Sequence, residues 1–156
     1  MHYTQKYNSP LGKITLASDG EKLIGLWFDG QKYFADVLDT VHEEKQLPIF
    51  EQTKIWLDTY FSGRAPNFTP PLEILATPFR KSVWEILLQI PFGQTMTYKE
   101  IAARLKSSAR AVGGAVAHNP ISIIIPCHRV IGTNGSLTGY AGGLDKKTRL
   151  LELERK

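Results

Sequence analysis

Cysteine is nearly absent from this sequence: Cys127 is the only one in 156 residues. A single thiol excludes an internal disulfide, which is typical of proteins kept in a reducing compartment. It also excludes any zinc site that needs two or more thiolates. Disulfide-stapled secreted domains and thiolate zinc modules are therefore ruled out as classes.

Long apolar runs are missing as well. No stretch approaches the roughly 20 apolar residues that a membrane-spanning helix needs. The opening segment, MHYTQKYNSPLG, has no basic region followed by an apolar one, so we expect no secretory signal. Neither sign of charge dominates, because the sequence has 19 Lys and Arg residues and 15 Asp and Glu residues, which gives a formal net charge of +4. This small basic excess is a weak indication of a polyanionic partner.

The N-terminal half has the patterns of strands followed by one helix. Apolar and polar residues alternate in residues 12–20 (GKITLASDG), and a second run, residues 22–30 (KLIGLWFDG), follows a Ser-Asp-Gly turn. With residues 3–7 as a partner strand, these runs predict an antiparallel meander. Residues 48–61 predict a helix, with Phe50, Leu57 and Phe61 at near-helical spacing. The proline-rich residues 64–78 are then expected to link two halves.

The C-terminal half has helix signals instead. Thr77 and Pro78 predict an N-cap and first helical position, and an apolar stripe follows at Phe79, Val83, Ile86, Leu87 and Ile90. Thr97 and Glu100 have the spacing of a capping box, which predicts a helix through Leu105. After a break at residues 106–108, residues 109–117 predict another helix. Helix, short break and helix is the helix-turn-helix pattern.

The second of these helices, ARAVGGAVA, is unusual because Arg110 is its only long side chain. Gly113 and Gly114 lie mid-helix, where each glycine costs roughly 1 kcal/mol against alanine. One interpretation is that the glycines allow tight packing on a neighbouring helix. The other is a smooth helix that presses on DNA, with Arg110 projecting from its start.

The single thiol lies in the stretch IPCHRV, after the apolar run Ile123–Ile125. A nearby cation favours the thiolate, which is the nucleophilic form, and His128 and Arg129 are the adjacent candidates. The alternative is that Cys127 is one of the many inert, buried cysteines. Further on, residues 138–154 predict a glycine-rich loop and a helix with Lys147 and Glu154 on one face. Glu154 could orient an imidazole, as in a triad, or could be an exposed residue near a charged terminus.

Together these segments resemble the O6-alkylguanine-DNA alkyltransferase family of suicide repair proteins. IPCHRV is similar to the family's active-site motif, and ARAVGGAVAHNP and GYAGGL match its flanking motifs in order and spacing. Thr97-Tyr98 matches the segment that opens the first helix of its helix-turn-helix. The resemblance covers nearly all of residues 78–154, whereas the N-terminal half, with SPLG before the meander, is less diagnostic.

The resemblance implies an α+β fold in two domains. Residues 1–75 would form a ribonuclease H-like scaffold with the antiparallel meander and its helix, and residues 76–156 a helical, winged helix-turn-helix domain. The implied activity is that of a methylated-DNA–protein-cysteine methyltransferase that acts once. Its catalytic residues would be Cys127 as alkyl acceptor, His128 as the base acting through a water, and Glu154 polarising His128.

The resemblance also implies residues that bind DNA and the flipped base. Tyr98 would contact the base, Arg110 would fill the gap in the base stack, and Asn119 would brace the active-site turn. The other residues would line the guanine pocket or support the loop and the thiolate; these are Val130, Tyr140, Ala141 and Lys147. Such an arrangement suits the chemistry, because an O6-alkyl group inside a duplex is reached only by flipping the nucleotide out, at a cost of a few kcal/mol.

The sequence departs from the family in several respects, among them Arg155 after Glu154, where a glycine is often found. Some members carry zinc in the N-terminal half, but the cysteines for it are missing here, so we expect no metal and no cofactor. Ala141 stands where some relatives have serine.

Two rival classes remain. A cysteine hydrolase would need a distant histidine, and His2, His42 and His118 lie in no recognisable partner motif. A DNA-binding regulator without chemistry would keep the helix-turn-helix, but such proteins usually dimerise and no heptad segment is evident. The expected partner is double-stranded DNA containing O6-alkylguanine, bound by a monomer without membrane association. The expected location is the cytoplasm, with the nucleoid in a prokaryote or the nucleus in a eukaryote.

Overall fold

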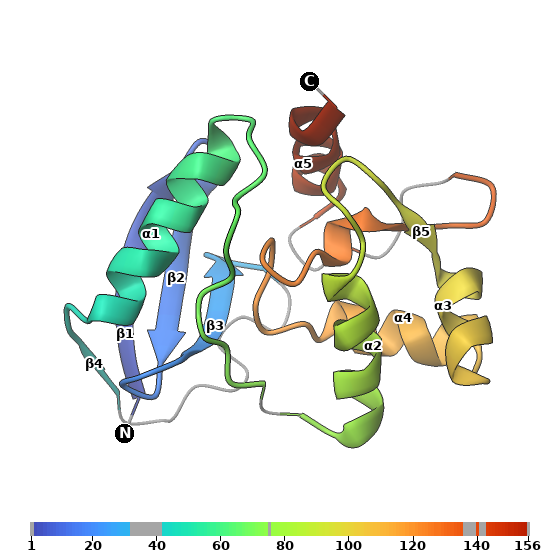
Figure 1. The fold of residues 1–156 in the computed structure, drawn as a ribbon, viewed down its shortest axis with the longest axis horizontal. Coiled ribbons are helices and arrows are strands. Elements are labelled where there is room, and N and C mark those ends of the chain that lie inside the picture. Colours follow the sequence, from blue (N-terminus) through green and yellow to red (C-terminus); the bar gives the residue numbers. More distant parts are fainter. Residues whose placement is uncertain (1, 32–41, 75, 136–139, 141–142, 156) are drawn as a thin grey trace.

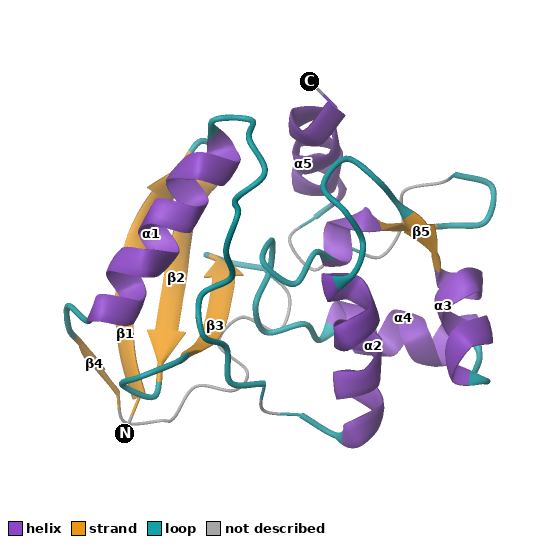
Figure 2. Ribbon diagram, viewed as in Figure 1, coloured by secondary structure: helices purple, strands orange, loops and turns teal. Residues whose placement is uncertain are grey.

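The computed structural model describes residues 2–31, 42–74, 76–135, 140 and 143–155. As predicted, the fold is α+β, with a sheet and one covering helix in the N-terminal half and a group of helices in the C-terminal half (Figures 1 and 2). Within these ranges, no helix has the length and apolar character needed to cross a membrane.

The N-terminal half is built on a four-stranded sheet with the strand order β3-β2-β1-β4. Its strands are β1 (His2–Ser9), β2 (Gly12–Ser18), β3 (Leu23–Phe28) and β4 (His42–Glu44). The antiparallel pairing of β1 with β2 and of β2 with β3 confirms the predicted meander. Strand β4, which pairs parallel to β1, was not predicted, because three exposed residues carry no alternation that would mark a strand.

Helix α1 (Pro48–Phe61) lies across one face of this sheet (Figure 1). Its buried side comprises Ile49, Phe50, Thr53, Trp56, Leu57 and Tyr60. The predicted stripe was wrong at its end, since Tyr60 is fully buried whereas Phe61 is only half-buried. Tyr60, rather than Phe61, therefore lies on the side of α1 that meets the C-terminal half, and it brings a phenol hydroxyl there.

Strand β3 joins the two halves. On its free side, Leu23 exchanges backbone hydrogen bonds with Pro71 and Glu73 of the proline-rich segment. Three residues further along β3, Leu26 exchanges backbone hydrogen bonds with Pro120 and Ser122, just before the cysteine loop. The segment predicted as a linker is therefore partly an extension of the sheet. These bonds also cover an edge that would otherwise expose unpaired backbone groups.

The C-terminal half contains the helices that the sequence predicted. They are α2 (Pro78–Leu88), α3 (Tyr98–Leu105), α4 (Ala109–Ala117) and α5 (Leu144–Arg155). The short 3-10 helix η1 (Cys127–Arg129) was not predicted. Two strands that were not predicted, β5 (Met96–Thr97) and β6 (Val130–Ile131), pair in parallel and hold the start of α3 beside the end of η1. Each is only two residues long, too short for a periodic signal.

Local sequence signals account for where these helices begin. The Thr77 hydroxyl accepts a bond from the Arg80 N–H, and Thr97 and Glu100 form both bonds of the capping box. One part of the α2 stripe was wrong: Phe79 is 36% exposed, because it lies in the first turn, beyond the reach of the core. The predicted break between α3 and α4 is confirmed, with Lys106 in the left-handed region at φ 53°.

Candidate active site and candidate nucleic-acid interface

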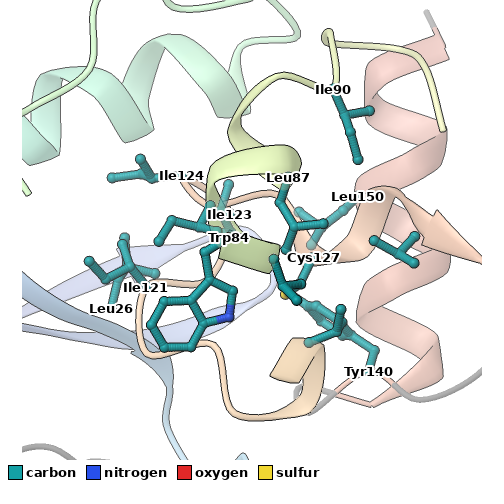
Figure 3. Packing of buried hydrophobic residues seen from close by; sticks show 14 of the residues in the cluster. Leu26, Trp84, Leu87, Ile90, Ile121, Ile123, Ile124, Cys127, Tyr140 and Leu150 are labelled. Atoms are coloured by element: carbon teal, nitrogen blue, oxygen red, sulfur yellow. The ribbon is translucent and has the colours of Figure 1, made fainter. Parts of the chain in front are cut away.

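Cys127 is packed into the core where the chain enters η1. It is 3% exposed and belongs to the main apolar cluster. Figure 3 shows its sulfur among buried side chains that include Leu87 of α2, Leu150 of α5 and Tyr140. Ile123, four residues earlier, has a φ of 70°, a left-handed conformation that a β-branched residue rarely adopts. The loop that carries the thiol is therefore held in a shape that its own residues do not favour.

Burial controls the acidity of this thiol. It raises the pKa of Cys127 to about 11, although a hydrogen bond from Asn119 and the charge of Lys147 both favour the thiolate. The thiol is consequently protonated at neutral pH. A reaction at sulfur therefore needs a base nearby, and a cation to stabilise the anion once it forms.

His128 has the position and the protonation state that such a base requires. It is fully buried, and its Nε2 lies 2.5 Å from Oε2 of Glu154. Burial lowers the pKa of His128, and Arg129 and Lys147 act in the same direction, so the ring is neutral at physiological pH. A neutral ring that donates Nε2–H to the carboxylate has its lone pair on Nδ1. Among the described residues, Nδ1 has no hydrogen-bond partner, which leaves it available to accept a proton.

Glu154 is the acceptor at the centre of a buried network. The interpretation of Glu154 as an exposed terminal residue was wrong, because it is 5% exposed. Its Oε1 accepts from Arg129 Nε at 2.8 Å and from the Gly93 N–H at 2.9 Å. Its Oε2 accepts from the Tyr60 hydroxyl at 2.6 Å. Burial alone would raise the pKa of Glu154, but the bonds from His128 and Arg129 outweigh it and lower the pKa to about 2.

Arg129 does not stand beside the thiol as its position in the sequence suggested. Its guanidinium points to the other side of η1, where it bonds both oxygens of Glu154 and, through Nη1, the carbonyl of Ile90 at 2.7 Å. Successive residues of a 3-10 turn project in different directions, so neighbours in sequence separate in space. Arg129 balances the charge of Glu154, and the cation for the thiolate comes from elsewhere.

That cation is Lys147 of α5. Its ammonium group is fully buried, donates to the Val130 carbonyl at 2.6 Å and lies 5.8 Å from the centre of the Tyr98 ring. Burial lowers the pKa of Lys147 to about 8, while the nearby Cys127 acts to raise it. Thiolate and ammonium therefore stabilise each other: whichever charge is present makes the other easier to form.

Asn119 braces the turn before the cysteine. Its Nδ2 donates to the Ile125 carbonyl at 2.7 Å, and its Oδ1 accepts from the Ile121 N–H at 3.0 Å. Tyr140 belongs to the same buried cluster as Cys127 and is 8% exposed, and burial raises its pKa well above the usual value. Ala141 lies outside the described residues.

The remaining sequence candidates lie along a groove on the outer side of α4. The groove has a volume of about 500 Å³ and is lined by Tyr98, Lys99, Ala109, Arg110, Gly113, Ala117, Gly132 and Thr133. Arg110 is exposed at the start of α4. A Cβ atom placed on Gly113 or Gly114 would meet no atom within 4 Å. The interpretation that these glycines pack against another helix is therefore wrong, and the smooth face is open to solvent.

Models of known protein families match both halves of the chain. The family model for the 6-O-methylguanine DNA methyltransferase DNA binding domain matches residues 78–156, and the model for the ribonuclease-like domain of the same enzyme matches residues 1–74. The chain belongs to the 6-O-methylguanine DNA methyltransferase family.

Relatives within this family match over nearly their whole lengths. The methylated-DNA–protein-cysteine methyltransferase of Methanosarcina acetivorans is 46% identical over 154 residues and covers 97% of each chain. The enzyme of that name from Haemophilus influenzae is 40% identical over 158 residues, covering 99% of this chain and 87% of its own. The crystal structure of Mycobacterium tuberculosis OGT in complex with DNA superposes with a TM-score of 0.89 at 42% identity, covering 98% of this chain and 92% of the other.

Sequence reasoning missed one residue of this methyltransferase site, Tyr60. It lies 94 residues from Glu154 along the chain, on a helix whose apolar spacing explains it as an ordinary core residue. The only available signal was that a phenol at a fully buried position needs a hydrogen-bond partner.

The two glycines of α4 permit a matched test of the groove. Gly113→Ala and Gly114→Ala should each stabilise the protein by about 0.5–1 kcal/mol, because both are helical and each added methyl has space. Only Gly113 lines the groove, so only Gly113→Ala should weaken binding to duplex DNA. Thermal unfolding and fluorescence anisotropy would measure both effects. Equal DNA affinity of the two variants would show that α4 does not approach DNA through this face.

Proposed function

We propose that this protein reverses alkylation damage in double-stranded DNA by moving the alkyl group from O6 of guanine to Sγ of Cys127. The observation that carries the proposal is a buried row of three groups: the protonated thiol of Cys127, the neutral imidazole of His128 next to it in sequence, and the ionised carboxylate of Glu154, which bonds to His128. In this set the imidazole can take the proton of the thiol and so form the thiolate, in a site from which water is largely excluded.

The reaction begins when the Cys127 thiol gives its proton to Nδ1 of His128 through a bridging water. Glu154 stabilises the imidazolium, and Lys147 stabilises the thiolate. Sulfur then attacks the alkyl carbon in line with the C–O6 bond; the new S–C bond forms as the C–O6 bond breaks. The electron pair of the broken bond passes to O6 and the purine ring, which recovers a proton from His128 and leaves as guanine. Since S-alkylcysteine is a thioether with no easy route back, each molecule acts once.

Access to the damaged base would come through the groove of α4. Arg110, exposed at the start of α4, would enter the base stack, where an inserted side chain offsets part of the cost of flipping a nucleotide. Tyr98 would contact the nucleotide as it leaves the stack, and Val130, Tyr140 and Ala141 would line the pocket that receives guanine. Repair has to work in any sequence, and a helix with few long side chains suits contacts to the phosphate backbone rather than to base edges.

The proposal extends to the organisation of the protein. Residues 1–75 would act as a scaffold and residues 76–156 as the part that binds DNA and reacts. We propose that the protein works as a monomer in the cytoplasm, at the nucleoid of a prokaryote or in the nucleus of a eukaryote.

Intact-protein mass spectrometry tests this function directly. After incubation with a duplex carrying O6-methylguanine, the protein should be heavier by one CH2 unit, with at most one equivalent transferred and the label mapped to Cys127. Cys127→Ser should bind the same duplex and gain no mass. An unchanged wild-type mass with tight binding would indicate recognition without repair, and an unchanged mass without binding would refute DNA repair altogether.

A further inference from the structure

The hydroxyl of Tyr60 lies at the catalytic network although its helix belongs to the N-terminal half. The residue is fully buried, and its ring stacks on Trp56 at 5.4 Å and meets the edge of Phe92 at 5.9 Å. These contacts fix the direction of the phenol. Its oxygen lies 2.6 Å from Oε2 of Glu154 and 3.3 Å from Nε2 of His128.

Three donors share this carboxylate oxygen, and Arg129 Nη2, at 3.2 Å, is the most distant of them. His128 Nε2 approaches Oε2 at 2.5 Å, and the Tyr60 hydroxyl approaches it at 2.6 Å. When several donors share an anionic oxygen, each of them disperses the charge of that oxygen and weakens the hydrogen bonds that the oxygen accepts from the others. The contact between Tyr60 and the histidine itself is longer, so the effect through the carboxylate dominates. Burial and the negative charge of Glu154 raise the pKa of Tyr60 far above its usual value, so it stays a donor at all physiological pH values.

The charges around His128 show why this competition matters. Glu154 acts to raise the pKa of His128, whereas burial, Arg129 of η1 and Lys147 of α5 lower it. Cys127, next to it in η1, is uncharged until it gives up its proton, and Tyr60 is the neutral titratable group that α1 contributes. Within the described part of the chain, Glu154 is thus the group that favours the charged form of the ring, and Tyr60 donates to the same oxygen that accepts from His128.

We propose that Tyr60 is a positioning residue for alkyl transfer, which restrains the pull of Glu154 on His128 and so keeps the imidazole neutral and ready to accept the Cys127 proton. This inference rests on the proposed function. It also gives the N-terminal half a role in the chemistry, since the restraint comes from α1 and would be lost if that helix moved away.

Removal of the hydroxyl has a predictable sign. In Tyr60→Phe the ring packing is kept, Oε2 loses one donor, and Glu154 holds the His128 proton more strongly. The pKa of His128 should then rise by roughly half a unit to one unit, because the lost bond is charge-assisted and partly replaced by a stronger one from His128. Transfer needs the neutral ring, so the acid limb of the pH profile of transfer should move to higher pH by the same amount as the pKa of His128. Below the midpoint, the rate should fall about three- to tenfold.

The experiment has two readouts and one matched control. The 15N resonances of His128 are titrated in the free protein, and single-turnover transfer from an O6-methylguanine duplex is timed across pH. Tyr7→Phe is the control, because Tyr7 also donates to a carboxylate, that of Asp58 at 2.6 Å, but at an exposed site on the sheet. Tyr60→Phe should shift both readouts upward with unchanged DNA affinity, while Tyr7→Phe should shift neither.

The outcomes separate this inference from the proposed function. If the wild type transfers no alkyl group, the proposed function fails, and the histidine titration still tests the link between Tyr60 and His128. If Tyr60→Phe loses thermal stability but keeps the wild-type titration and pH profile, Tyr60 is structural only and the inference is overturned. A fluorinated tyrosine at position 60 covers the case in which Tyr60→Phe does not fold. It keeps the shape and is a stronger donor, so the pKa of His128 should move down; an unchanged pKa would equally overturn the inference.

Discussion

Glu154→Ala should destabilise the protein by about 3–5 kcal/mol and abolish alkyl transfer, because it leaves a buried cation without its counter-charge. Of its hydrogen bonds to described residues, Arg129 would keep the one to the Ile90 carbonyl, and the Gly93 N–H would lose its acceptor. His128 would lose the partner that fixes its orientation. Denaturant unfolding measures the first effect and single-turnover transfer the second.

Two further variants make this result specific. Glu152→Ala changes an exposed carboxylate on the same helix and should alter stability by less than about 0.5 kcal/mol. Glu154→Gln keeps the shape and removes the charge. If Glu154→Ala proved as stable as Glu152→Ala, the buried network would not be a source of stability.

The stability contributed by Glu154 should also depend on pH in a defined direction. Its pKa is lowered from 4.5 in the unfolded chain to about 2 in the fold. A carboxyl group with a lowered folded pKa contributes stability that is fully present above its unfolded pKa and is lost as pH falls through the folded value. The difference in unfolding free energy between wild type and Glu154→Gln should therefore be constant near neutral pH and shrink between about pH 4.5 and pH 2.

Asn119→Ala is the second change with a large expected effect, a loss of roughly 1.5–4.5 kcal/mol of stability together with slower transfer. The substitution leaves the Ile121 N–H buried without its partner, at a cost of about 1–3 kcal/mol. It also removes one of the two donors of the Ile125 carbonyl, which keeps its bond from the Cys127 N–H and loses about 0.5–1.5 kcal/mol. It also removes a hydrogen bond that favours the thiolate, so the pKa of Cys127 should rise further. The rise of the remaining transfer activity with pH should accordingly lie at higher pH than in the wild type.

Unfolding curves and a pH series of transfer rates would check both parts. Asn8→Ala, at an exposed position in β1, is the matched control and should change neither. A stable Asn119→Ala protein with an unaltered pH dependence would mean that the cysteine loop keeps its shape without this side chain.

Sequence patterns located the helices of the C-terminal half because their signals are local. The Thr97–Glu100 capping box and the Thr77 side chain that caps α2 act within one turn of helix, so neighbouring residues suffice to specify them. The cysteine, its histidine and the distant Glu154 came from the resemblance to a family. Spacing alone left Glu154 open, since a helix face indicates which residues align and not what they meet.

The features that were missed depend on contacts between distant segments. Tyr60 and Arg129 became recognisable as parts of the site only when α1, η1 and α5 were placed together. Arg129 in particular follows the cysteine by two positions, yet the 3-10 turn directs it away from sulfur. Strand β4 and the pair β5–β6 form because a neighbouring backbone offers partners, not because their own residues alternate.

The carboxylate of Glu154 has one consequence for motion. It binds groups from α1, from the loop at Gly93 and from η1, so three separate stretches of chain are tied to one residue of α5. None of them can detach without leaving a buried charge or donor unpaired, and such losses make local openings cooperative. The active site should therefore open as one unit with the terminal helix, or remain shut.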